Sequence, residues 1–148
     1  MIEMGSGDAG VAADERDTVE CFLAAVNSHD PEQLRGVIAP DFLFEEAAGR
    51  GEASIRALQA ELEMVVAAFP DMAFRPVRQT PEGDRWYVEF KAIGTHRGEF
   101  LQVPPTGALA ILSGVFNLRV QDDLVRELRL TADFGGLRRQ LLLAARMV

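Results

Sequence analysis

The chain has 148 residues, of which 48% are hydrophobic, and a formal net charge of -8 at pH 7. This length suits one domain with its own core, and the hydrophobic fraction excludes a disordered chain. The acidic balance argues against nucleic acid and anionic lipid as partners, because phosphate groups are bound by clustered Lys and Arg. The hydrophobic residues are too interrupted for a membrane span, so we expect no membrane partner.

The N-terminal residues differ in composition from the rest of the chain. Residues 1–16 are rich in Gly, Ala, Ser and Asp without a sustained period, which predicts a flexible tail before a single domain over residues 17–148. A basic n-region and an apolar h-region are missing there, so we expect no signal peptide. Cys21 is the only cysteine and cannot form an internal disulfide. We therefore expect a cytoplasmic protein, with Cys21 buried or half-buried in a helix.

The first half of the chain has the periodicity of helices. Beginning at Asp17, apolar residues recur every three or four positions, which predicts an amphipathic helix. Asp30 followed by Pro31 is typical of a helix start and predicts a short helix to about Ile38. Residues 41–46 then resemble a short strand. A longer helix follows, with its apolar face formed by Ile55, Leu58, Leu62, Val65, Val66 and Phe69.

The second half has the pattern of strands. Four are predicted, roughly over residues 72–79, 84–95, 109–120 and 124–132, and Asp133 is a plausible N-cap for a last helix. Helices followed by a meander of strands indicate an α+β fold. The helices can cover one face of a curved antiparallel sheet, so we expect a cone with a central hydrophobic cavity.

The connection between the second and third long strands is unusually long. It runs from Gly94 to Gly107 with the sequence GTHRGEFLQVPPTG. Its adjacent prolines, Pro104 and Pro105, cannot donate to a strand ladder, which predicts a stiff flap at the mouth of the sheet. Three apolar flap residues would be costly to expose and should fold over the cavity as a lid: Phe100, Leu101 and Val103.

This flap resembles a signature of the SnoaL-like polyketide cyclases, which belong to the NTF2-like superfamily of cone-shaped α+β barrels. The resemblance extends to SHDPEQL, FPDMAF and DFGGLRRQL, and covers nearly everything after about Asp17. It implies the same fold, a homodimer and the cyclisation of a polyketide. In such cyclases a carboxylate and a facing histidine perform an aldol closure.

The resemblance places that acid–base pair on apolar residues. The flanking motifs put the carboxylate position on Leu130 and the histidine position on Phe116, and a pocket asparagine falls on Phe44. These side chains cannot carry a proton, so an aldol mechanism through these positions is excluded. An apolar pocket can instead hold an extended chain in reacting geometry. We therefore expect a cofactor-free cyclase that closes a polyene or enone chain pericyclically, by [4+2] cycloaddition.

Alternatives remain open at this stage. Acid-assisted cyclisation, by epoxide opening or a modified aldol reaction, could use His96, Glu45 or Glu46. Asp133 is a further catalytic candidate, although it more readily suits a capping role, as His96 does a structural role in the flap. One of the two glutamates should point toward the cavity, because strand residues alternate. A third hypothesis is a non-catalytic module that binds a small hydrophobic molecule.

The expected substrate-binding residues are apolar and aromatic: Phe44, Met64, Trp86, Phe90, Phe100, Phe116, Leu128 and Leu130. The two histidines, His29 and His96, form no metal-binding motif, and no nucleotide-binding glycine motif is present, so we expect no metal or cofactor. The outer sheet face should carry Ser113, Val115, Asn117, Arg119, Val125, Glu127 and Arg129. This mixed surface suits a homodimer formed through the sheets.

Overall fold

A computed structural model describes the backbone of residues 2–146 and the side chains of residues 15–146. Its elements, in chain order, are α1 (Ile2–Ser28), α2 (Pro31–Arg35), β1 (Ile38–Phe44), α3 (Glu52–Ala68), β2 (Ala73–Glu82), β3 (Arg85–Thr95), β4 (Leu109–Gln121), β5 (Leu124–Ala132) and α4 (Phe134–Arg146). None of the described helices is long and apolar enough to cross a membrane.

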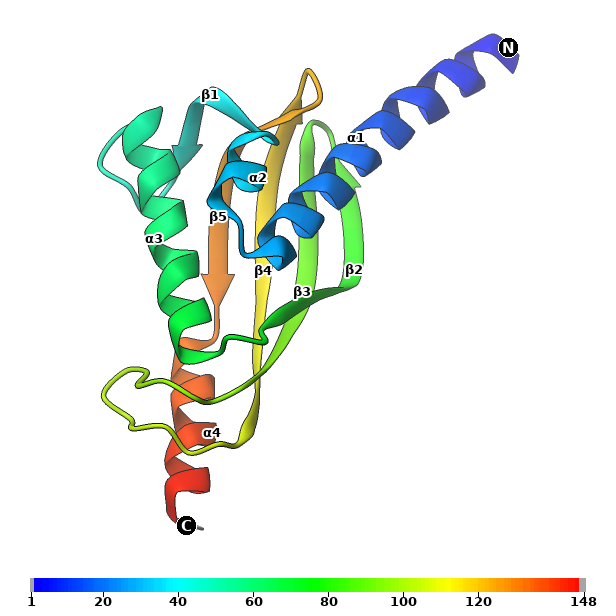
Figure 1. Ribbon diagram of the computed structural model, residues 1–148. Helices are drawn as coiled ribbons and strands as arrows, with labels where there is room; N and C mark the ends of the chain where they lie inside the picture. The colour runs from blue at the N-terminus through cyan, green and yellow to red at the C-terminus, as the bar shows by residue number, and fades with distance from the viewer. Residues whose placement is uncertain (1, 147–148) are drawn as a thin grey trace.

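The five strands form one curved sheet in the order β1-β5-β4-β3-β2. The four long strands pair antiparallel, whereas β1 pairs parallel with β5 at the edge. Figure 1 shows α1 crossing the sheet and α3 running beside β1 and β5. The α+β class and the curved sheet are therefore confirmed. The parallel edge strand is possible because β1 and β5 are far apart in the sequence and need no hairpin between them.

The first helix begins earlier than expected. Its backbone is helical from Ile2, and its N-terminal half extends away from the rest of the domain (Figure 1). The flexibility of residues 1–16 stays a prediction, because the side chains of residues 1–14 lie outside the described set. The end of this segment is docked, because Glu15 accepts a hydrogen bond of 3.0 Å from Trp86 Nε1 and the Arg16 guanidinium lies over the Trp86 ring. The prediction for Cys21 was wrong, because this side chain is exposed.

Two strand boundaries and one strand face also differ from the sequence predictions. The short second helix ends at Arg35, so β1 begins at Ile38 and ends at Phe44, before Glu45. The prediction that Val125 faces outward was wrong, because Val125 is fully buried. The pairing of β4 with β5 shifts by one residue between Arg119 and Val120, and such a bulge moves the following side chains to the other face.

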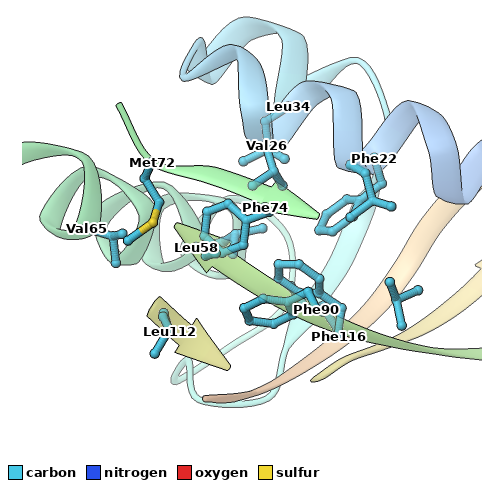
Figure 2. Close-up of a cluster of buried hydrophobic side chains, with 14 of the residues drawn as sticks. Phe22, Val26, Leu34, Leu58, Val65, Met72, Phe74, Phe90, Leu112 and Phe116 are labelled. Atoms are coloured by element: carbon cyan, nitrogen blue, oxygen red, sulfur yellow. The ribbon is translucent and has the colours of Figure 1, made fainter. Parts of the chain in front are cut away.

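The centre of the cone is filled by aromatic side chains. Phe22 of α1, Phe74 of β2, Phe90 of β3 and Phe116 of β4 meet there (Figure 2). The rings of Phe90 and Phe116 stack with centroids 4.6 Å apart, and Phe22 meets Phe116 edge-on at 5.3 Å. Phe74 lies 5.2 Å from Phe90 and 5.8 Å from Phe116. The cavity that we expected at this point is therefore occupied by core packing.

Candidate functional site

An open pocket lies on the helical side of this aromatic cluster. It has a volume of about 290 Å³ and is bounded by α1, α2, α3 and the start of β2. Its walls are mostly apolar: Ala25, Val26, Leu34, Leu62, Val66 and Phe74. This volume is at the lower end of the range for ligand pockets, roughly 300–1,000 Å³. The pocket therefore suits a small hydrophobic molecule or one segment of a longer chain.

The residues that we expected to bind substrate do not line this pocket. Phe44, Trp86, Phe90, Phe100, Phe116 and Leu128 are buried, Leu130 is half-buried, and Met64 on α3 is 43% exposed. Phe74 belongs to both regions, because it packs in the aromatic cluster and also lines the pocket. A binding role for the expected residues stays a prediction, and it would require the buried ones to rearrange around a ligand.

The two positions assigned to the family's acid–base pair are neighbours in the sheet. Phe116 of β4 and Leu130 of β5 are directly paired across the ladder. Paired residues on one face of an antiparallel sheet have adjacent side chains. Phe116 is completely buried in the aromatic cluster, and Leu130 packs against the same core. This part of the site is therefore a hydrophobic contact, without a group that can donate or accept a proton.

His96 is buried at the start of the flap and holds the flap together. Its Nδ1 accepts a hydrogen bond of 3.2 Å from the Thr106 backbone N–H and lies 3.0 Å from Thr106 Oγ1. The proton of the neutral ring is therefore on Nε2, which is buried and has no partner among the described residues. The ring stacks on Phe69, with centroids 5.4 Å apart. These contacts are the hydrogen bonding to the flap backbone that we expected, and a catalytic role for His96 stays a prediction.

The flap is bound to the C-terminal end of α3. The backbone N–H groups of Arg97 and Gly98 donate to the Ala68 carbonyl, which has no partner within its own helix. A Cβ atom at Gly98 would lie 2.5 Å from the Ala67 carbonyl oxygen, so this approach requires glycine. Asp71 accepts hydrogen bonds from the Thr95 backbone N–H and hydroxyl, and these bonds lower its pKa.

The tip of the flap is a tight turn. Phe100 and Val103 exchange two backbone hydrogen bonds, and Leu101 and Gln102 between them have positive φ angles of 47° and 70°. Phe100 and Val103 are buried, with Phe100 meeting the ring of Phe69 edge-on, but Leu101 is 40% exposed. The lid prediction was wrong for Leu101. Phe100 and Val103 are buried as expected, but they do not line the pocket.

Neither glutamate after β1 lines the pocket. Glu45 forms an ion pair with Arg129 of β5, and Glu46 is exposed. The alternation argument fails here because the strand ends at Phe44. Desolvation, followed by the nearby carboxylates of Glu61 and Glu45, raises the pKa of Glu46 above its usual value. An acid role for either residue stays untested.

Asp133 caps the last helix, as we expected. Its Oδ1 accepts a hydrogen bond of 2.9 Å from the Gly136 N–H in the first turn of α4. A Cβ atom at Gly136 would lie 2.2 Å from the other carboxylate oxygen, so the glycine makes room for the cap. Asp133 does not line the pocket, and a catalytic role for it stays a prediction.

The polar residues of the pocket were not among our sequence candidates. They are His29, Asp30, Gln59 and Glu63, which come from the end of α1, the start of α2 and one side of α3. In the sequence we considered His29 only as a metal ligand, and Asp30 only as a cap. A signal was available, because SHDPEQL combines a histidine with a helix start where two helices must meet. Among the described residues, no group of three or more His, Cys, Asp or Glu side chains is arranged to hold a metal ion.

The sequence profile of the SnoaL-like polyketide cyclases matches residues 16–141. The chain therefore belongs to this family, and the resemblance found in the flap and the last helix is confirmed. Membership supports a role as a polyketide cyclase. None of the curated proteins with which the sequence was compared matches it.

Solved structures agree with this assignment. IdmH from Streptomyces antibioticus, which has been proposed to be a polyketide cyclase, is 30% identical, with a TM-score of 0.74 over 86% of this chain and 97% of IdmH. AclR from Streptomyces galilaeus, which has been proposed to be a hydroxylase, is 26% identical, with a TM-score of 0.75 over 87% of this chain and 81% of AclR. TsrD from Streptomyces laurentii is 25% identical, with a TM-score of 0.74 over 87% of this chain and 95% of TsrD.

Proposed function

We propose that this protein is a polyketide cyclase that closes a ring without proton transfer by the family's acid–base positions. One observation carries the proposal: Phe116 and Leu130 are paired across β4 and β5 and pack in the core. A hydrophobic pair at this point cannot enolise a substrate or protonate a leaving oxygen. The reaction that this region suits best is a pericyclic closure, in which bonds rearrange within the substrate itself.

The proposed substrate is a polyene or enone chain with an apolar segment that fits the pocket. Two substrate segments held in reacting geometry can lower a barrier by about 7–11 kcal/mol in the best cases. A [4+2] cycloaddition needs this positioning and gains from a hydrogen bond to a conjugated carbonyl. Phe74 lies between the pocket and the aromatic cluster, so a shift of this ring would extend the pocket toward Phe90 and Phe116.

Two measurements on the purified protein test the proposal. A linear precursor should be converted to a cyclic product of the same mass, with many turnovers per protein molecule. The value of kcat should be nearly constant between about pH 5.5 and 8.5, whereas acid–base catalysis would give a bell or a limb. Binding without turnover would favour the non-catalytic module. A pH limb that disappears in Glu45→Gln or Glu46→Gln would favour the acid-assisted mechanism.

We also propose that two copies associate through the outer face of the sheet. The outward side chains of β4 include Leu109, which is 70% exposed, and Ile111, which is 39% exposed. Glu127 on the same face is nearly buried under Arg85 and Arg119, with ion-pair distances of 3.1 Å and 2.9 Å. Sedimentation equilibrium should give a dimer mass that Ile111→Lys reduces to the monomer; a monomeric wild-type protein would refute this arrangement.

A further inference from the structure

The polar edge of the 290 Å³ pocket contains a histidine, His29, with one hydrogen-bonded ring nitrogen and one that has no partner among the described residues. We propose that His29 anchors the ligand: its Nδ1 accepts a hydrogen bond from a hydroxyl group on an otherwise apolar, uncharged molecule. This inference shares with the proposed function the assumption that the pocket binds the ligand. It adds a specific residue and a specific functional group of the ligand.

The orientation of the His29 ring is fixed by the main chain. Its Nε2 lies 2.8 Å from the carbonyl oxygen of Met72. A carbonyl oxygen can only accept, so Nε2 carries a hydrogen, and in the neutral ring the lone pair is on Nδ1. Among the side chains that the structure describes, none is hydrogen bonded to this Nδ1. The ring is therefore held at one nitrogen and available at the other.

The backbone at His29 is also fixed in an unusual conformation. Its φ angle is +59°, which is uncommon for a residue with a side chain, and it follows the last residue of α1. The side chain of neighbouring Asn27 binds both the N–H and the carbonyl of Phe74, at 2.7 Å and 2.9 Å. His29 and the pocket wall at Phe74 are therefore attached to the same short segment, Met72 to Phe74 at the start of β2, so their relative position is set before a ligand binds.

The other polar groups of the pocket favour an uncharged ligand. Asp30 and Glu63 bring carboxylates to the same edge and would repel an anionic ligand such as a fatty acid. Asp30 Oδ1 is already used, since it accepts from the Glu32 N–H at the start of α2. One N–H of the Gln59 amide donates to the Pro31 carbonyl oxygen, with an N···O distance of 3.4 Å. An uncharged hydroxyl at His29 fits these neighbours better than a carboxylate does.

Three naphthalene probes test this assignment on the full-length protein. They are 2-naphthol, which has a hydroxyl donor, 2-methoxynaphthalene, which has only an acceptor, and naphthalene. At about pH 8.5, where imidazoles are ordinarily neutral, 2-naphthol should bind roughly 2- to 10-fold more tightly than 2-methoxynaphthalene. In His29→Asn this preference should disappear, since asparagine tolerates positive φ but lacks the reach of the ring. A preference that persists in His29→Asn would overturn the proposal.

A spectroscopic measurement keeps the test independent of how well the variant folds. The chain has two histidines, so ¹⁵N-labelled histidine gives two sets of ring signals, with buried His96 as an internal control. The His29 Nδ1 signal should be that of an unprotonated nitrogen, and 2-naphthol, not 2-methoxynaphthalene, should shift it. A protonated Nδ1 in the free neutral protein, or no shift with 2-naphthol, would overturn the assignment.

The two proposals fail in different ways. Equal binding of 2-naphthol and 2-methoxynaphthalene would overturn the role of His29 and leave the cyclase proposal standing. No binding of any probe would refute the pocket as a ligand site, and with it the role of His29. Selective binding without turnover of a linear precursor would confirm His29 and refute the cyclase.

Discussion

The two regions between the helices and the sheet differ in what occupies them. On the sheet side, Phe90 and Phe116 fill the space where the family's acid–base chemistry is expected. On the helical side, an open pocket retains four polar residues at its edge. The two positions that the motifs assign to the family's acid–base pair therefore lie in packed core and do not line an open cavity. Aromatic core packing occupies this region, and the polar groups of the pocket lie where α1, α2 and α3 meet.

The largest expected effect comes from breaking the packed region. Phe116→Ala should lower the free energy of unfolding by about 3–5 kcal/mol, because it leaves a void among rings that cannot collapse freely. Urea denaturation measures this loss. Phe116→Leu serves as a control that keeps most of the volume. A loss below about 1 kcal/mol in Phe116→Ala would mean that the centre of the cone is not tightly packed.

The next effect concerns the flap, which is bound to α3 beside the pocket. Gly98→Ala should destabilise the protein by about 1–3 kcal/mol, because its Cβ would lie 2.5 Å from the Ala67 carbonyl oxygen. Gly49→Ala is the matched control: its Cβ would have no neighbour within 4 Å, and we expect a change within about 0.5 kcal/mol. Equal thermal midpoints for the two variants would contradict the close approach of the flap to α3.

A smaller effect is expected at the end of β5, beside Leu130. Asp133→Ala removes the hydrogen bond to the Gly136 N–H and should cost about 1 kcal/mol. Asp133→Ser should restore most of this stability, since serine also caps helices. If Asp133→Ala instead abolished turnover of a linear precursor with stability unchanged, Asp133 would have a role in the reaction beyond capping.

The smallest expected effect is a pH dependence on the outer face. Burial alone would raise the pKa of Glu127, but hydrogen bonds from Arg119 and Arg85 outweigh it and leave the pKa lowered. A lowered folded-state pKa stabilises the protein above the unfolded value, about 4.3, and this contribution is lost as the pH falls through the folded pKa. The difference in unfolding free energy between wild type and Glu127→Gln should therefore shrink below about pH 4. A constant difference would exclude this ionic contribution.

Much of the fold could be predicted because local patterns and family motifs agree in this chain. The periodicity from Val19 to Val26 and the Asp133 cap correspond directly to α1 and α4. The face of Val125 could not be predicted, because a bulge depends on pairing between strands. The apolar pair at 116 and 130 was visible from the motifs. The motifs could not show whether those side chains line a cavity or fill it. That depends on how Phe22, Phe74 and Phe90, from three different elements, pack against them, and no local pattern predicts this packing.

The pocket itself was the harder part to foresee. His29 precedes a recognisable helix start in SHDPEQL, but the orientation of its ring depends on a contact with Met72, 43 residues away. A side chain oriented by a distant carbonyl gives no periodic signal. The sequence motifs therefore indicated the filled region, and the structure was needed to find the open one.

We propose that ring closure by this protein needs no proton transfer at positions 116 and 130. High-resolution mass spectrometry of a strain from which this gene has been deleted tests it most directly. A linear compound should accumulate with the same elemental composition as the normal cyclic product. A compound that differs by one water would indicate condensation chemistry, and one that lacks an oxygen would indicate hydroxylation; either result, or an unchanged metabolite profile, would contradict the claim.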